Sequence, residues 1–286
     1  VITQSLTFVA TCNAIKYIGA DPVFIDVDRH TLGLSAKALG LWLDENAVID
    51  DDGICRDKLE NRIIRACVPM HTFGHPVDLD GLLKLTKIWK IALVEDAAES
   101  LGSFYKDQHT GTFGEVGTLS FNGNKIITTG GGGMILSDQA AGKRAKHLTT
   151  TAKKPHPYEY VHDEVGYNYR MPNLNAALGL AQLEMLESFV TAKRSLASFY
   201  DSLLLNSDLL FVREPPNCRS NYWLNAVICE DRSHRDHLLK ITNTQRIMTR
   251  PIWTLMSHLD MYKECRRGDL ETSEWLEARV VNLPSS

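Results

Sequence analysis

The segment Ser120-Phe121-Asn122-Gly123-Asn124-Lys125 places an amine in a polar turn, and four consecutive glycines, Gly130 to Gly133, follow shortly after it. Upstream, Asp96 and Glu99 follow an apolar run that ends at Val94. A free lysine has a pKa of about 10.4, so a lysine that attacks carbonyl groups needs desolvation or a nearby positive charge. The amine and the carboxylates together predict covalent chemistry on a carbonyl compound. Pyridoxal phosphate would use both, with a lysine for its Schiff base and an aspartate for its pyridinium nitrogen.

Each of these residues also has an ordinary explanation. Taken alone, Lys125 would be a solvated turn lysine, and Asp96 would be an acid that caps the helix after a strand. The glycine run lacks the Gly-Lys-Ser/Thr sequence of a nucleotide-binding Walker loop, so a tight turn with close backbone approach is the favoured role. The order of the motifs along the chain favours the cofactor interpretation for Lys125 and Asp96.

Three other residues are candidates for weaker reasons. His71 and His75 lie on either side of Gly74 after a strand-like run, but no third ligand is near them in the sequence, so we predict hydrogen-bonded histidines beside a pocket and no metal site. Arg250 follows a strand-like stretch and could hold a substrate carboxylate through two hydrogen bonds, with a surface salt bridge as an equal alternative. We therefore assign His71 and Arg250 to substrate binding as hypotheses.

The composition is that of an ordinary globular protein. The 286 residues are 44% hydrophobic and 23% charged, with a net charge of −4. The length favours one large domain plus a smaller one. The absence of a basic block argues against nucleic acid and anionic membrane surfaces as partners. No apolar stretch approaches the roughly 20 residues that span a bilayer. Six scattered cysteines without a CxxC pair indicate reduced thiols and a cytoplasmic protein.

The first half of the chain alternates strand and helix patterns. Short apolar runs separated by amphipathic segments indicate βαβ units and a mostly parallel sheet, whose ligands collect at the carboxyl ends of the strands. Asp26, His71 and Asp96 fall at such ends. The predicted strands cover residues 1–3, 22–27, 63–69 and 91–94, and the predicted helices cover 8–18, 35–45 and 78–89.

Two short strands, 117–121 and 133–136, flank the lysine turn and predict an antiparallel addition to the sheet. Asn173 is a suitable N-cap for a long helix whose leucine stripe over 178–189 indicates core or dimer packing. The pattern then becomes α+β, with strands over 222–229 and 247–253 and a helix over 234–243. We place a domain boundary near 190, which gives a large domain over 1–190 and a small domain over 191–286.

Five stretches, in this order, carry a resemblance to a known family. They are Thr7–Thr11, Val68–Pro76, Glu95–Ser100, Ser120–Gly133 and Gly166–Leu178. The chain resembles the DegT/DnrJ/EryC1/StrS family of sugar aminotransferases, and within it the LegC-type enzymes of nonulosonic (legionaminic) acid pathways. The resemblance implies the fold type I of pyridoxal phosphate-dependent transferases, an α/β architecture in which helices flank a mostly parallel central sheet and a smaller α+β C-terminal domain follows.

The resemblance also implies residue roles. Lys125 would form the Schiff base and move protons, and Asp96 would pair with the pyridinium nitrogen. Ser120 would bind the cofactor phosphate, and Phe8 would stack on the ring. Glu99 stands where many members carry Gln near the phenolic oxygen of the cofactor. The last of these residues, Asn168, would reach the phosphate of a neighbouring subunit, which implies a homodimer with a shared active site.

The implied reaction is transfer of an amino group from L-glutamate to a nucleotide-linked 4-keto-6-deoxy sugar, with a UDP-N-acetylhexosamine derivative as the expected substrate and cell-surface polysaccharide synthesis as its setting. The family carries a Gly-Thr phosphate-binding turn before the point that matches Val1, so we expect a chain truncated at both ends. Two alternatives stay open: a sugar 3-dehydratase, whose members carry His at the position of Lys125, and a catalytically silent dimer partner.

Overall fold

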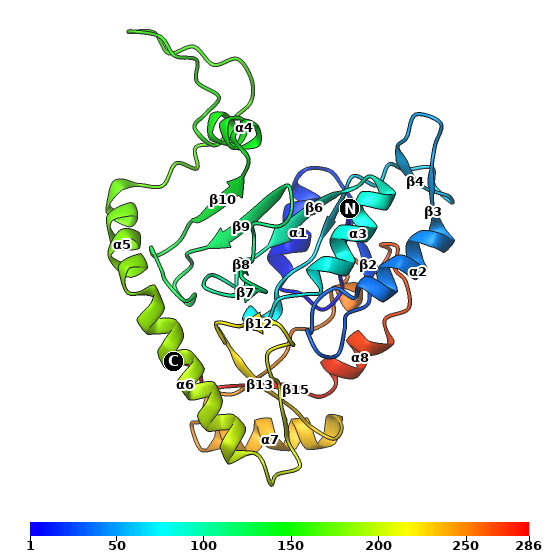
Figure 1. The fold of residues 1–286 in the computed structure, drawn as a ribbon, viewed down its shortest axis with the longest axis vertical. Helices are drawn as coiled ribbons and strands as arrows, with labels where there is room; N and C mark the ends of the chain where they lie inside the picture. The colour runs from blue at the N-terminus through cyan, green and yellow to red at the C-terminus, as the bar shows by residue number, and fades with distance from the viewer. Residues whose placement is uncertain (286) are drawn as a thin grey trace.

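The computed structural model describes residues 1–285, and a six-stranded sheet forms its centre in the order β10-β9-β6-β5-β1-β2 (Figure 1). Every neighbouring pair is parallel except β9 with β10, which is antiparallel. This confirms the predicted parallel sheet and the antiparallel addition. The strands are β1 (Ile2–Gln4), β2 (Val23–Ile25), β5 (Ala66–Val68), β6 (Ala92–Asp96), β9 (Val116–Ser120) and β10 (Gly133–Ser137).

The order of the sheet reverses at β1. The next parallel strand along the chain, β2, lies on one side of β1, whereas β5, β6 and β9 extend the sheet on the other side. In open α/β sheets the crevice at such a reversal, outside the carboxyl ends of the strands, is where ligands bind. The topology therefore predicts a ligand-binding site among the loops that follow β1, β5, β6 and β9.

Three helices in the first 90 residues connect the parallel strands: α1 (Val9–Tyr17), α2 (Ala36–Asn46) and α3 (Leu79–Trp89). The hydroxyl of Ser35 caps α2 and the carboxylate of Asp78 caps α3, which explains why both helices begin where the sequence predicts. Leu39, Leu43 and Leu82 from α2 and α3 belong to a buried cluster with sheet residues such as Ile25 and Leu93.

Several short elements were not anticipated from the sequence, because strands of two or three residues carry almost no periodic pattern. They include a hairpin of β3 (Ala47–Ile49) and β4 (Cys55–Asp57), and a small sheet of β12 (Cys218–Arg219), β7 (Phe104–Tyr105) and β8 (Gln108–His109). Two single turns of 3₁₀ helix, η1 (Thr72–Gly74) and η2 (Met256–His258), complete this group.

The C-terminal part forms a second, four-stranded antiparallel sheet in the order β11-β13-β15-β14. Its elements are β11 (Leu210–Phe211), β13 (Asn225–Ile228), β14 (Arg250–Pro251), β15 (Val280–Leu283) and the helix α7 (Arg232–Thr244). The sheet and helix agree with the predicted α+β pattern.

The proposed boundary near 190 falls inside a continuous helix, α6 (Leu186–Leu203), which runs down one side of the molecule in Figure 1. The chain also returns to the first unit after β14: Met256, Tyr262 and Leu270 pack with Cys12 and Phe24. A further helix, α8 (Glu271–Glu277), precedes β15. Residues 191–285 are therefore not a separate unit, because several of their apolar side chains complete the core of the first.

Two helices at the other end of the molecule, α4 (Gln139–Thr149) and α5 (Asn173–Glu184), have no buried residue, and the segment between them projects from the body as an arm (Figure 1). Leu178, Leu180 and Leu183 of the predicted leucine stripe are thus exposed, whereas its last members, Leu186 and Phe189 on α6, pack partly buried against the core. The predicted N-cap is also wrong: Asn173 is already the first helical residue, and Pro172, which has no capping side chain, precedes it.

All six cysteines are free. Over residues 1–285, no helix combines the length and apolar character that crossing a membrane requires.

Candidate active site

Asp96 is the last residue of β6, and both of its carboxylate oxygens are engaged. The Thr11 hydroxyl on α1 donates to Oδ2 at 2.6 Å, and the Ala98 backbone N–H donates to Oδ1 at 3.1 Å. The parallel register pairs Asp96 with Thr118 of β9, so Asp96 lies beside the strand that leads to the lysine turn. The two donors fix the orientation of a partly exposed carboxylate at the carboxyl end of the sheet.

Lys125 follows β9 in a turn whose hydrogen bonds close it against the sheet. The Phe121 N–H donates to Gly132 and the Thr129 N–H donates to Phe121. The lysine side chain is 12% exposed, and its Nζ lies 3.6 Å from Oε1 of Glu99. The amine is thus largely withdrawn from water, which is one of the two conditions that carbonyl chemistry on a lysine requires, and it lies beside a carboxylate rather than a second cation.

Glu99 is the buried acid of the site, with 3% of its surface exposed. Its Oε2 accepts a 2.8 Å hydrogen bond from the backbone N–H of Phe73, a residue in the left-handed region at φ 57°. Burial raises the pKa of Glu99 to about 7, although the Lys125 charge and the Phe73 N–H oppose that rise. Near neutral pH this carboxyl can therefore either donate or accept a hydrogen bond.

Ser120 and Phe8 lie in positions compatible with their predicted roles. The Ser120 hydroxyl, at the end of β9, accepts from the Asn122 N–H at 3.3 Å and keeps its own hydrogen available for an acceptor. Phe8 precedes α1, is 48% exposed, and its ring centroid lies 6.4 Å from that of Trp253. A half-exposed ring one helical turn before Thr11 can cover one face of a planar ligand.

His71 occupies a different position from the one predicted. It is completely buried, its Nδ1 accepts from the Val77 N–H at 3.2 Å, and its Nε2 therefore donates to Glu95 at 3.1 Å. Both ring nitrogens are used within the protein, so the side chain is not presented to a substrate. The assignment of His71 to substrate binding is corrected to a structural hydrogen bond, the alternative that the sequence also favoured.

Glu95 is the fully buried partner of His71 and also accepts from the backbone N–H groups of Gly111, Phe113 and Gly114. Burial raises the pKa of Glu95, but the His71 and glycine hydrogen bonds outweigh burial and hold the pKa below its ordinary value. This carboxylate fastens the loop that enters β9 to the strand that carries Asp96.

The remaining candidates lie apart from these contacts. His75 is buried with its ring edge-on to Tyr222, and burial lowers its pKa to about 4. The guanidinium of Arg250 bonds Asn243 of α7 at 2.9 Å. Asn168 is exposed at the base of the arm, where its backbone bridges to Thr150. The fold of this one chain brings none of the three into contact with Lys125.

Two residues that the sequence patterns do not single out, Thr11 and Trp223, contact the site directly. Thr11 lies in a recognised stretch, but nothing in that stretch indicates that its hydroxyl would meet Asp96. Trp223 lies in the C-terminal part, its ring centroid is 3.9 Å from Nζ of Lys125, and its indole N–H donates to the Asn124 carbonyl at 2.7 Å. No pattern of a few neighbouring residues predicts the contact between Trp223 and Asn124, which lie 99 positions apart.

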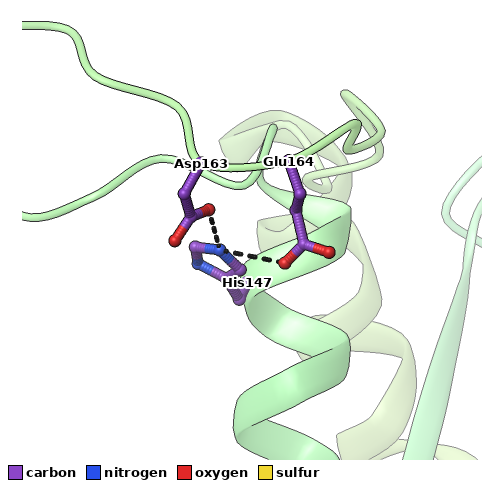
Figure 2. A group of neighbouring side chains, drawn as sticks. All are labelled: His147, Asp163 and Glu164. Carbon is purple, nitrogen blue, oxygen red and sulfur yellow. Dashed lines mark hydrogen bonds and ion pairs between the residues drawn. The ribbon is translucent and has the colours of Figure 1, made fainter.

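Figure 2 shows a separate group on the surface, in which His147 of α4 meets Asp163 and Glu164 of the arm. Nε2 of His147 lies 2.8 Å from Asp163 and 3.5 Å from Glu164. The guanidinium of Arg144 also pairs with Glu164, at 2.7 Å through one of its nitrogens. Because the Arg144 guanidinium already pairs with the Glu164 carboxylate, this group is an ion-pair network that connects the arm to α4.

The whole chain matches a known family of aminotransferases. The model of the DegT/DnrJ/EryC1/StrS aminotransferase family matches residues 1–286, and the chain belongs to that family. It is 35% identical over 286 residues to the GDP-perosamine synthase of Escherichia coli O157:H7, covering all of this chain and 73% of that protein. It is also 37% identical over 255 residues to EpsN of Bacillus subtilis (strain 168), whose name describes a pyridoxal phosphate-dependent aminotransferase. That match covers 88% of this chain and 63% of EpsN.

Among solved structures, the aminotransferase TlmJ from Streptoalloteichus hindustanus superposes with a TM-score of 0.87 at 28% identity, over 99% of this chain and 73% of that one. The agreement confirms the predicted fold. The residues present also fit pyridoxal phosphate: a withdrawn amine for its aldehyde, an oriented carboxylate for its ring nitrogen, a hydroxyl for its phosphate and an aromatic ring for its face lie around the strand ends.

Proposed function

We propose that the protein is a pyridoxal phosphate-dependent sugar aminotransferase that moves the amino group of L-glutamate to a nucleotide-linked 4-keto-6-deoxy sugar. The observation that carries the proposal is the withdrawn amine of Lys125, 3.6 Å from Glu99, on the same edge of the sheet as the oriented carboxylate of Asp96. Family membership supports the reaction class, and the names of two relatives support the sugar and the cofactor.

Pyridoxal phosphate, when bound, supplies an aldehyde that exchanges amino groups and a ring that delocalises the charge left by a broken C–H bond. The carboxylate of Asp96 would hold a proton on the ring nitrogen by charge attraction, and Thr11 and Ala98 keep that carboxylate in place. Ser120 donates to the phosphate, and Phe8 covers one face of the ring.

Lys125 moves the proton during the exchange because its flexible stem carries a single amine into a site largely without water. Glu99, whose pKa lies about 7, can take up or return a proton beside that amine as the charge on Lys125 changes. Arg250 is proposed to bind the carboxylate of the amino donor, which requires its guanidinium to leave Asn243.

The sugar nucleotide that accepts the amino group is proposed from the resemblance and from the names of the relatives. The resemblance to LegC-type enzymes favours a UDP-N-acetylhexosamine derivative, whereas three relatives are named for a GDP-linked sugar. A direct comparison of UDP- and GDP-linked 4-keto-6-deoxy sugars, with glutamate as donor and 2-oxoglutarate formation as the readout, decides between them.

We also propose that two copies of the chain associate. Large apolar side chains of α5, β10 and the arm are exposed at one end of the molecule. Exposed apolar side chains that gather in one region are typical of a protein–protein interface. A second copy is the proposed cover, because Asn168 lies at the base of the same arm and would then reach the partner's site. The exposed residues are Met134, Ile135, Val165, Tyr167, Tyr169, Leu174, Leu178, Leu180 and Leu183.

The test of the function is an absorbance spectrum of the purified chain with added pyridoxal phosphate, followed by borohydride reduction and peptide mass mapping. A visible band and a reduced adduct on Lys125 are expected. An adduct on another lysine would refute the role of Lys125, and neither band nor adduct would favour the silent dimer partner. Light scattering on the same sample measures the mass and tests the dimer.

A further inference from the structure

Among the described residues, Trp223 is the one aromatic ring whose face lies against the Lys125 amine, and it makes two different contacts with the lysine turn. Its ring face lies beneath the amine, with 3.9 Å between Nζ and the ring centroid. Its indole N–H donates a 2.7 Å hydrogen bond to the carbonyl of Asn124, the residue directly before the lysine. One side chain thus holds both the backbone and the amine of the lysine turn.

The position of Trp223 is itself fixed by the protein. The ring is 6% exposed and belongs to the core cluster that joins the two sheets. Its backbone N–H donates to Oδ1 of Asn221, and Nδ2 of Asn221 donates to the carbonyls of Glu99 and Leu101, both at 2.9 Å. The indole is therefore connected rigidly to the same loop that carries Glu99.

We propose that Trp223 is a positioning residue for Lys125, which holds the charged amine over its indole face whenever the lysine is not bound to the cofactor. An aromatic face attracts a cation most strongly when water is excluded, and the Lys125 side chain is only 12% exposed. Glu99 and Trp223 then hold the ammonium from two directions, 3.6 Å and 3.9 Å away. The C-terminal part of the chain thereby takes part in the site through one side chain.

This inference rests on the proposed function for its purpose, but its test does not. In the full chain without added cofactor, the rate of acetylation of each lysine by a small acylating reagent is measured by peptide mass spectrometry at fixed pH. Only the neutral amine reacts, so loss of the attraction between the cation and the indole face should speed labelling of Lys125. The expected increase for Trp223→Leu is about five- to thirtyfold, the range from an exposed to a desolvated cation–π contact. Lys37, exposed on α2, serves as the internal reference.

Two further samples separate the attraction from simple uncovering. Uniform incorporation of fluorinated tryptophan preserves the shape of the ring while withdrawing charge from its face, and it should also raise Lys125 labelling relative to Lys37. This sample decides the matter if Trp223→Leu does not fold. Trp89→Phe, on α3, removes a different indole and should leave Lys125 labelling unchanged.

In the enzyme with cofactor, Trp223→Leu should lower kcat about tenfold while KM changes by less than about twofold, because the ring is only 6% exposed and acts through the amine above it. Unchanged Lys125 labelling in both the Leu variant and the fluorinated protein would overturn the inference. If the proposed function is wrong, the parent protein will instead show no borohydride-trapped adduct.

Discussion

The Thr11 hydroxyl donates a 2.6 Å hydrogen bond to Oδ2 of Asp96, although 85 positions separate the two residues along the chain. The bond links the first turn of α1 to the carboxyl end of β6, on either side of the reversal in strand order. It orients the one carboxylate in the site whose proposed partner is a ring nitrogen.

Thr11→Val removes that bond and keeps the shape of the side chain. We expect kcat to fall about 10- to 150-fold, the cost of one hydrogen bond to a charged group, with the cofactor still bound. Steady-state kinetics and the cofactor spectrum measure the two effects. Thr11→Ser, which retains the hydroxyl, should stay near the parent, and an equal loss in both variants would indicate a packing effect.

Asp96→Asn tests the charge itself. The amide cannot hold a proton on the ring nitrogen, so kcat should fall by roughly 10² or more, while the affinity for pyridoxal phosphate changes much less. Titration of the cofactor band gives the affinity and product formation gives kcat. A kcat equal to that of the parent would remove the proposed role, and Asp51→Asn, an exposed loop change, is the control.

Lys125→Ala should reduce transamination by roughly 10³ or more and leave the circular dichroism spectrum intact, because the side chain supplies chemistry rather than core packing. Product formation by mass spectrometry is the measurement. Lys37→Ala should have full activity. Retained turnover in purified Lys125→Ala would show that another group carries out the reaction.

The buried carboxyl of Glu99 should make the free energy of unfolding depend on pH. Burial raises its pKa from 4.5 to about 7, so the native state holds this proton more tightly than the unfolded chain. The resulting stabilisation is complete below pH 4.5 and is lost as the pH rises through 7. Urea unfolding of the parent and of Glu99→Gln measures this effect. From pH 5 to pH 8, the free energy of unfolding should fall by roughly 2–3 kcal/mol more in the parent than in the variant.

The exposed Glu45 of α2 provides the control for that comparison, since Glu45→Gln should follow the parent at both pH values. A parallel pH dependence for the parent and Glu99→Gln would mean that the buried carboxyl does not titrate in this range.

Gly74→Ala tests the junction between the two sheets. At Gly74 φ is 94°, and a Cβ would lie 1.8 Å from Oδ1 of Asn221, whose amide also bonds the carbonyl of Glu99. Strain and overlap together should lower the free energy of unfolding by about 2–4 kcal/mol. Gly123→Ala, where a Cβ would meet nothing within 4 Å, should unfold like the parent in the same urea titration.

The sequence by itself determined the longer local elements and indicated the chemistry proposed for the site. Ser35 and Asp78 cap their helices and the apolar runs form parallel strands, because capping and side-chain periodicity act over a few residues. The ordered motifs around Asp96 and Lys125 also identified the family. These signals are local, so they remain readable in the linear chain.

Only the tertiary structure decided which side chains meet. His71 is buried against Glu95 rather than open to a substrate, the segment after Pro251 returns to the first sheet, and Trp223 reaches the lysine turn. Such contacts depend on how apolar surfaces distant in the sequence close into one core, and neither helical nor strand periodicity encodes them. The position of Trp223 beneath Lys125 is therefore a property of the packed molecule, since burial between the two sheets fixes it.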